Sequence, residues 1–437
     1  MSWLGAAGLL IGMILAFMGL GVPVAFAFLA ADIIGAMVFM GGVVGIEQLI
    51  SNAFSSITTF ALAPVPLFLI MGELFFHTGL AKRMFDAIDA LLGGLRARLS
   101  YLTVVGGTAF ATLSGSSMAS TALLGSLMIP EMSARGYKKT LSIGPILGTG
   151  GLAMLIPPSA LAVLLGTLAR IDIGLLLIAG VVPGLLLAGL YVLLITAQST
   201  LDPKAAPAYD VVTVPWGQRI RLLVKDVLPL SLVVFLVIGL ILLGWATPTE
   251  AAAFGVLGVV ILGVVYRCLS WEVIMRSLEG ATRVTAMALL IILGSTTFSQ
   301  LLAYSGASSG LISWAAGLGA SPIAMLLMMF AVLLLLGMFM DQLSMMLLTV
   351  PIFFPLAESF GFDLIWFAVI VLMALEISFT TPPFGLLLFV MKGVAPPDTR
   401  MTEIYVAALP YIGCSMLVVG LLIAEPEIAL WLTRFVE

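Results

Sequence analysis

Asp341 is a single carboxylate inside a long uncharged stretch of the chain. No residue from Val284 to Met340 is charged, and the next charged residue after Asp341 is Glu358. A carboxylate in an apolar membrane segment is costly unless a cation or a proton neutralises it. The first hypothesis is therefore that Asp341 coordinates Na⁺. The alternative is a protonated Asp341 that acts as a structural hydrogen bonder or as a proton carrier.

The second half of the chain also supplies other oxygen ligands that such a cation needs. Thr380 and Thr381 precede two prolines. These prolines break a helix, because proline lacks the backbone donor and disfavours helical geometry in the residue before it. We predict that the hydroxyls of Thr380 and Thr381, with carbonyls near Gly337, complete an all-oxygen shell around Na⁺. Glu376, five residues before Thr381, is a weaker candidate for the same roles as Asp341.

The stretch from Ser114 to Ser117 offers hydroxyl groups and a flexible backbone between two apolar runs. Each run reaches about 20 Å as a helix, against roughly 30 Å of hydrocarbon, so the two runs describe a re-entrant hairpin. At its tip, the N–H groups that open the second half-helix favour an anion, and the carbonyls that end the first suit Na⁺. We assign Ser114 and Gly115 to Na⁺, and Ser116 and Ser117 to a substrate. Small residues that merely let helices pack closely are the alternative.

Residues 155–159 read Leu-Ile-Pro-Pro-Ser and lie in the middle of an apolar run. The two prolines must break this helix and free carbonyl groups just before the break. We assign the carbonyls of Leu155, Ile156 and Pro157 to Na⁺ and the hydroxyl of Ser159 to the substrate. A proline kink without any ligand is the alternative.

The composition places these residues in a membrane. Of 437 residues, 62% are hydrophobic and only 9% are charged, as in a polytopic helical membrane protein. The net charge of −4 argues against nucleic acid as a partner. Two cysteines and one histidine are too few for a disulfide framework, a thiolate or His-rich metal centre, or a catalytic nucleophile set. No phosphate-binding loop motif is present. We therefore expect an ion gradient to drive the protein, with no enzymatic activity and no organic cofactor.

The second half of the chain repeats the first at an offset of 225 residues. Four prolines and a glycine recur at this offset, and a further proline recurs two residues later. The pairs are Pro23 and Pro248, Pro130 and Pro355, Gly136 and Gly361, Pro157 and Pro382, Pro158 and Pro383, and finally Pro183 and Pro410. Tandem halves are typical of secondary transporters. Coincidental proline spacing is the alternative.

Each half is predicted to contain a scaffold part followed by a transport part. We expect an all-α polytopic membrane protein in which each transport part holds a re-entrant hairpin and a broken transmembrane helix. The scaffold parts are 1–98 and 228–320, and the transport parts are 99–197 and 321–424. The hairpins are 99–130 and 322–357, and the broken helices are 140–168 and 364–391. A cytoplasmic connector, 198–227, carries a surface-lying helix around 216–224, and 425–437 is a C-terminal tail. Two short amphipathic segments are 82–96 and 307–319, and the other predicted spans are 4–20, 23–42, 60–77, 174–197, 228–244, 250–266, 284–303 and 403–424.

The basic residues give the expected orientation in the membrane. Suppose that the N-terminus is periplasmic and that each hairpin returns to the side it entered from. All 18 Lys and Arg except Arg170 and Arg434 then face the cytoplasm, as the positive-inside rule requires. A full crossing over 99–130 would instead put the basic cluster at 135–139 outside. The two halves enter from opposite faces, so the repeats are inverted.

Taken together, these motifs resemble the large membrane subunit of TRAP (tripartite ATP-independent periplasmic) transporters, the DctM type. The likeness covers nearly the whole chain. It is carried by Gly115-Ser-Ser-Met-Ala119, Ile129-Pro-Glu-Met132, Gly136-Tyr137, Ile156-Pro-Pro-Ser159, Ala179-Gly-Val-Val-Pro-Gly184, Asp341, Pro351, Pro355, Gly361, Thr381-Pro-Pro-Phe-Gly385 and Leu388-Phe389. Ser120-Thr121 departs from the family pattern, in which an acidic residue is expected soon after Gly-Ser-Ser. This departure bears on coordination at the first site and on the choice of substrate.

The resemblance implies Na⁺-coupled uptake of a small organic acid by an elevator mechanism, in which the transport parts slide against the scaffold. It also implies two partners, a small membrane (Q) subunit and a periplasmic substrate-binding (P) protein, at the bacterial inner membrane. Within the second-half motif we assign Thr381 and Gly385 to the substrate. Two alternatives stay open: a stand-alone Na⁺/H⁺ or anion antiporter of related fold, and a membrane enzyme or assembly scaffold.

Overall fold

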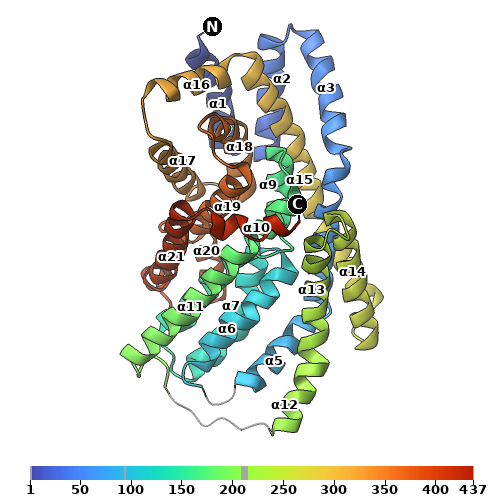
Figure 1. The fold of residues 1–437 in the computed structure, drawn as a ribbon, viewed down its shortest axis with the longest axis vertical. Coiled ribbons are helices and arrows are strands. Elements are labelled where there is room, and N and C mark those ends of the chain that lie inside the picture. The colour runs from blue at the N-terminus through green and yellow to red at the C-terminus, as the bar shows by residue number, and fades with distance from the viewer. Residues whose placement is uncertain (1, 93–94, 208–214, 437) are drawn as a thin grey trace.

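The computed structural model describes residues 2–92, 95–207 and 215–436, except for the side chains of residues 56, 61, 113, 114 and 291. Every regular element in these ranges is a helix, which confirms the all-α fold class (Figure 1). Within them, six helices are long and apolar enough to cross a bilayer, or seven if the pair Pro64–His77 and Leu80–Leu92, bent by 65°, is one span. The chain is therefore a multi-pass membrane protein.

The first half of the chain contains eleven labelled α-helices and two short 3₁₀ turns in the described ranges. They are α1 (Trp3–Gly19), α2 (Val24–Phe39), α3 (Val43–Ile57), η1 (Phe60–Leu62), α4 (Pro64–His77), α5 (Leu80–Leu92), α6 (Arg98–Ser114), α7 (Ser117–Ala134), α8 (Lys139–Gly151), η2 (Leu152–Met154), α9 (Ala160–Ala169), α10 (Ile173–Ala179) and α11 (Val181–Leu201). The predicted hairpin is α6 and α7, and the predicted broken helix is α8 and α9.

The second half follows the same order. Its elements are α12 (Trp216–Leu222), the π-helical turn η3 (Leu223–Val227), α13 (Leu228–Leu242), α14 (Pro248–Val265), α15 (Trp271–Tyr304), α16 (Ala307–Gly317), α17 (Pro322–Gly337), α18 (Gln342–Ser359), α19 (Leu364–Thr380), α20 (Leu386–Val394), α21 (Met401–Ala424), α22 (Glu427–Leu430) and η4 (Thr433–Phe435). The second hairpin is α17 and α18, and the second broken helix is α19 and α20.

The order of helices recurs about 225 residues along the chain. Shifted by that amount, α6 to α9 fall on α17 to α20 with nearly the same bounds, and α1 and α2 fall on α13 and α14. The pair α3 and α4 falls on the single helix α15. In the first half the helix is interrupted between Ile57 and Pro64. Pro64 and Pro66 lie next to this gap, and proline lacks the backbone N–H that a continuous helix would need. The opposite orientation of the two halves in the membrane stays a prediction.

Two predicted elements differ from the structure. The span 284–303 is part of α15, which begins at Trp271 because ion pairs one turn apart, Glu272 with Arg276 and Glu279 with Arg283, support an exposed helix before the apolar run. The predicted surface helix at 216–224 is not separate: α12 continues through η3 into α13, giving one helical stretch, Trp216–Leu242. By contrast, the closing span 174–197 is confirmed: it lies within one apolar helical stretch, Ile173–Leu201, in which Gly180 stands between α10 and α11.

The hairpin arms are also longer than expected. Helices α6 and α7 have 17 and 18 residues, or roughly 26 Å at 1.5 Å per residue. The second arm runs past Pro130 to Ala134, so this proline does not end the helix. Residues 43–57, to which no span was assigned, form α3, whose apolar and polar residues lie on opposite faces.

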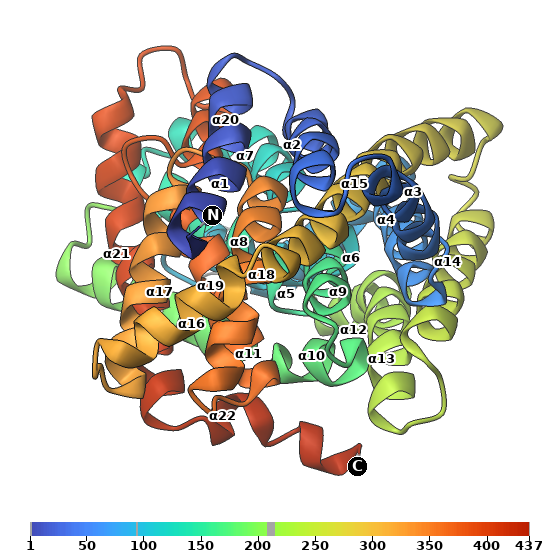
Figure 2. The same cartoon turned by 90° about the horizontal axis from the view of Figure 1, so that it is seen from above.

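The helices pack in two groups. Figure 2 shows α3, α4 and α14 on one side of the molecule and α17, α19 and α21 on the other, with α15 running across between them. Helix α8 packs closely on α21 of the second group. Gly144 and Gly148, one turn apart on α8, allow this close approach. A Cβ atom at Gly148 would lie 2.7 Å from the Tyr411 ring, so small residues are needed there.

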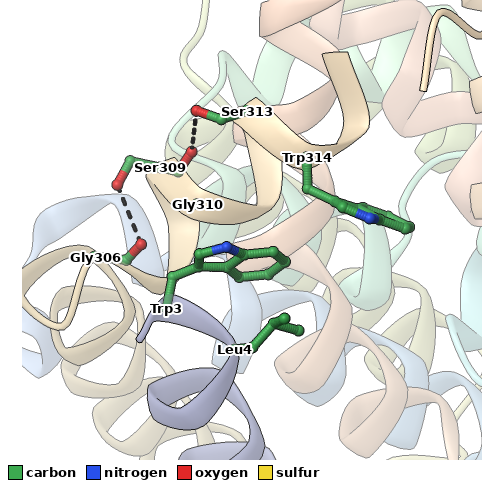
Figure 3. A pocket seen from close by; sticks show the side chains of 7 residues that line it. All are labelled: Trp3, Leu4, Gly306, Ser309, Gly310, Ser313 and Trp314. Atoms are coloured by element: carbon green, nitrogen blue, oxygen red, sulfur yellow. Dashed lines mark hydrogen bonds between the residues drawn. The ribbon is translucent and has the colours of Figure 1, made fainter. Parts of the chain in front are cut away.

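The start of α1 packs on α16 in a similar way. Figure 3 shows the Trp3 indole beside Gly310, in a hollow that also contains Ser309 and Trp314. A Cβ atom at Gly310 would overlap the Trp3 side chain. We expect Gly310→Val to displace Trp3 and to destabilise the fold by about 1–3 kcal/mol, the usual cost of overpacking. Thermal melting of the purified chain measures this loss.

Gly317 provides the matched control for this prediction. It lies on the same helix, and nothing is within 4 Å of the position its Cβ would take. Gly317→Val should therefore leave the melting temperature nearly unchanged. If Gly310→Val melts like the control, or if adding Trp3→Ala does not recover its lost stability, Trp3 does not pack there as described.

Candidate functional site

The two hairpin tips open onto one cavity. This cavity has a volume of about 330 Å³ and lies between the tips, α9, and the helices α4 and α15. Its lining residues are Val65, Leu69, Gly72, Glu73, Phe76, Gly115, Ser116, Ser117, Met118, Ala119, Ala160, Leu161, Leu164, Val284, Met287, Ala288, Asp341, Gln342, Leu343 and Phe379. Residues that are more than 200 positions apart in the sequence thus meet in one place.

Three helices begin at this cavity. The first residues of α7, α9 and α18 line it, through Ser117, Ala160 and Gln342 respectively. The N-terminus of a helix presents unpaired N–H groups and the positive end of the helix dipole, which together favour an anion. No Lys or Arg is among the described residues of the lining. An anion in this cavity would therefore be bound by backbone and hydroxyl groups.

The first hairpin tip contacts the first broken helix. Gly115 caps the C-terminus of α6 with a positive φ of 59°, which glycine adopts without steric cost. The Oγ of Ser116 accepts the Ala119 N–H at 3.3 Å and opens α7. A Cβ on Gly115 would lie 3.5 Å from the Pro158 carbonyl oxygen. The Oγ of Ser159 accepts the Ala162 N–H at 3.2 Å and opens α9. The N-termini of α7 and α9 therefore lie side by side.

Two buried hydroxyls near this tip have no hydrogen-bond partner among the described residues. They are the Oγ of Ser117 and the Oγ1 of Thr121, which lie one helical turn apart on α7. Thr121 packs directly against Gly150 of α8, and Thr149 beside it carries a third such hydroxyl. A buried hydroxyl without a partner is costly, and a bound cation satisfies its oxygen. These three oxygens are available to a ligand. Ser117 was predicted to bind the substrate, so a Na⁺ ion at this place is a new proposal that departs from that prediction.

The carbonyls of Leu155, Ile156 and Pro157, which we assigned to Na⁺, belong to the break between α8 and α9. The Leu155 carbonyl oxygen packs against Gly180, at the junction of α10 and α11, and the Ile156 N–H donates to the Leu152 carbonyl at 3.0 Å. The peptide bond between Pro157 and Pro158 is cis. Ser114 ends α6, and its side chain lies outside the described part of the chain. The assignment of these residues to Na⁺ stays a prediction.

Asp341 caps the N-terminus of α18. Its Oδ1 accepts the N–H groups of Leu343 at 3.0 Å and Ser344 at 3.1 Å, and its Oδ2 accepts the Ser344 hydroxyl. A carboxylate offers about four lone-pair sites, so one site stays open to a cation. The preceding turn supplies further oxygens, because the carbonyls of residues 337–340 accept no backbone N–H in the described structure. The oxygens of Asp341 and of this turn are therefore available to a cation, and Na⁺ binding here stays a prediction.

The second hairpin tip contacts the second broken helix. Gly337 packs against Ser378, and the ring of Phe339 lies 5.4 Å from that of Phe384. The hydroxyls of Thr380 and Thr381 donate to the Ile377 carbonyl at 3.0 and 2.6 Å, which leaves their lone pairs available. The break thus lies near the tip, as the proposed shell around Na⁺ requires.

The structure brings only some of the predicted residues to the cavity. Gly115, Ser116, Ser117 and Asp341 line it. Ser159, Thr381 and Gly385 are not part of the lining, although Ser159 opens a helix that is. The Gly385 N–H donates to the Thr381 carbonyl at 3.0 Å in a tight turn. The substrate roles of these three residues stay predictions.

Glu376 does not line the cavity. Its carboxylate packs against Gly151 of α8, next to the Gly150 that Thr121 contacts, and its Oε2 has no hydrogen-bond partner among the described residues. Its Oε1 accepts from the Tyr191 hydroxyl at 3.2 Å and from the Ser415 hydroxyl at 3.4 Å, inside the group formed by α8, α11 and α21.

Sequence reasoning missed Gln342, Phe379 and the wall from α4 and α15, which includes Glu73. Gln342 could have been found from the sequence, because it is a polar residue directly after Asp341 in an apolar run. The apolar residues of the wall do not differ from ordinary core residues in the sequence.

Comparison with known proteins identifies the family. The profile of the "Tripartite ATP-independent periplasmic transporter, DctM component" matches residues 11–428. This chain belongs to the DctM family. It is similar to the C4-dicarboxylate TRAP transporter large permease protein DctM of Rhodobacter capsulatus, with 31% identity over 97% of this chain and 98% of that one. The DctM of Pseudomonas aeruginosa is 34% identical over 84% of each chain.

A solved structure supports the fold. The YdaH transporter of Alcanivorax borkumensis superposes with a TM-score of 0.64 over 89% of each chain at 14% sequence identity. At that identity the likeness concerns the fold alone. The DctM-family match confirms the resemblance that the motifs indicated.

Proposed function

We propose that this DctM-family permease takes up a small organic acid together with Na⁺. The observation that carries the proposal is the shared cavity, onto which both hairpin tips and three helix N-termini open. The helix N-termini would bind the carboxylate of the substrate. Na⁺ ions at Asp341 and at the Ser117 and Thr121 hydroxyls would offset the negative charge. Substrate binding would then depend on Na⁺.

The packing supports an elevator movement. The cavity lies between one wall, from α4 and α15, and an opposite side formed by the hairpins and α9. In the proposed mechanism the transport parts, 99–197 and 321–424, slide against the scaffold parts, 1–98 and 228–320. The hairpins and broken helices would move together, because each tip contacts the break of its own half.

The family belongs to tripartite systems, and we propose the corresponding partners. A small membrane (Q) subunit would widen the scaffold, and a periplasmic (P) protein would deliver the acid. The permease would lie in the inner membrane with its N-terminus in the periplasm. The two similar relatives are named for C4-dicarboxylates, and a carboxylate substrate fits the helix N-termini.

Uptake into proteoliposomes tests the coupling and the partners. The chain is reconstituted with its small subunit, and uptake of a labelled acid is measured with an inward Na⁺ gradient or with choline in place of Na⁺. We expect uptake only with Na⁺ and only when the soluble binding protein is added. Uptake without the binding protein would favour the stand-alone antiporter, and uptake in choline would contradict Na⁺ coupling.

Cysteine labelling tests the orientation of the first hairpin. Cys268 and Cys414, both partly buried, are first replaced by serine. We expect single cysteines at Lys82 and Arg135 to react with a membrane-impermeant maleimide from the same side. A cysteine at Arg170 should react from the opposite side. If the cysteines at Lys82 and Arg135 label from different sides, the first hairpin crosses the membrane completely.

A further inference from the structure

Glu73 is a carboxylate on the wall of the cavity that faces the hairpin tips. It lies on α4, one turn before His77, and its side chain is 32% exposed. Its Oε2 lies 3.2 Å from the Nε2 of His77. An imidazole in such a contact donates an N–H to the carboxylate.

The neighbouring helix fixes the position of this carboxylate. A Cβ atom at Gly280 of α15 would lie 2.8 Å from the Glu73 Oε2. The carboxylate therefore packs against the backbone of α15 at a position where any larger residue would displace it. Val284 and Ala288, one and two turns further along α15, line the same cavity. Glu73 is thus held at one end of the wall.

The charges of the cavity are arranged at two poles. At the hairpin tips are the N-termini of α7, α9 and α18, which favour a carboxylate, together with Asp341, whose charge Na⁺ would offset under the proposed function. On the wall from α4 is Glu73, whose ion-pair partner in the described structure is His77, and no Lys or Arg is among the described residues of the lining. A second carboxylate on the substrate would face Glu73 and be repelled, whereas an ammonium or amidinium group there would form a charge-assisted hydrogen bond. The surface between the poles is apolar.

We propose that Glu73 is a specificity-determining residue that selects acids with a cationic group at the end opposite the carboxylate. The proposal rests on the proposed function, because it assumes that the carboxylate binds at the hairpin tips. The substrate class is a zwitterionic carboxylate with an apolar body. Dicarboxylates are rejected by the like charge of Glu73.

Four-carbon acids of matched length test this preference. The purified full chain is titrated in Na⁺ buffer with 4-aminobutyrate, butyrate and succinate, and with the cyclic amidinium acid ectoine, while thermal unfolding is followed. We expect 4-aminobutyrate or ectoine to stabilise the chain and succinate not to. Glu73→Gln should weaken binding of the cationic acid at least about tenfold, the loss of one charge-assisted hydrogen bond. The same variant should bind succinate better than the original chain does.

Glu47→Gln is the matched control, since Glu47 is exposed on α3 and does not line the cavity. It should bind all four acids as the original chain does. The proposal is overturned if succinate binds the original chain as well as the cationic acids, if neither cationic acid binds, or if Glu73→Gln leaves the order of affinities unchanged. A cationic acid that binds equally in Na⁺ and choline would instead contradict the Na⁺ coupling and leave the role of Glu73 standing.

Discussion

Asp341→Ala is expected to abolish Na⁺-driven uptake in proteoliposomes. The substitution removes the only carboxylate within the second hairpin tip, where it would offset the charge of Na⁺. It also removes the cap of α18, which accepts two backbone N–H groups. The loss of the cap costs about 0.5–2 kcal/mol, which the apolar packing of the hairpin should tolerate. Uptake at saturating Na⁺, with the protein's insertion checked in parallel, measures the effect.

Asp341→Asn separates the two roles of this residue. Asparagine caps helix N-termini about as well as aspartate, so the variant should melt close to the original chain. It lacks the negative charge, so Na⁺-driven uptake should still be lost. An Asp341→Asn variant with the original dependence of uptake on Na⁺ concentration would show that the carboxylate does not coordinate the ion.

Thr121→Val is expected to weaken Na⁺ binding without weakening the fold. The Thr121 hydroxyl is buried and has no hydrogen-bond partner in the described structure. Removing such a group in the absence of Na⁺ should leave the free energy of unfolding unchanged or raise it, by up to about 1–3 kcal/mol. If the hydroxyl binds Na⁺, the Na⁺ concentration for half-maximal uptake should rise about tenfold or more, as for the loss of roughly 1.4 kcal/mol.

Thr103→Val serves as the control for this substitution. Thr103 is equally buried, lies on the other arm of the same hairpin, and donates its hydroxyl to the Leu99 carbonyl at 2.7 Å. The Thr103→Val variant should leave the dependence of uptake on Na⁺ concentration unchanged. A Thr121→Val variant that needs no more Na⁺ than this control would remove Thr121 from the ion site. In that case the departure from the family pattern at Ser120-Thr121 has no bearing on the ion.

Much of the local architecture could be predicted from the sequence. The paired prolines at 157–158 and 382–383 break their helices, because the lost donor and the restricted preceding residue act within a few positions. The short arms around Gly115, and the recurrence at 225 residues, placed both hairpins within a few residues of their observed bounds. Errors arose where exposed ion pairs extended a helix beyond its apolar run, as at the start of α15.

The sequence by itself determined the class of protein, the helix breaks at the paired prolines and Asp341 as a charge that needs compensation, since composition and backbone chemistry act locally. That the two hairpins turn back within the membrane stays a prediction. Only the tertiary structure decided which of these meet. It brought Ser117 and Asp341 to one cavity, left Glu376 outside the lining, and added Glu73 from α4. The physical reason is that the neighbours of a side chain depend on how helices far apart in the chain pack together, and no local pattern records that packing.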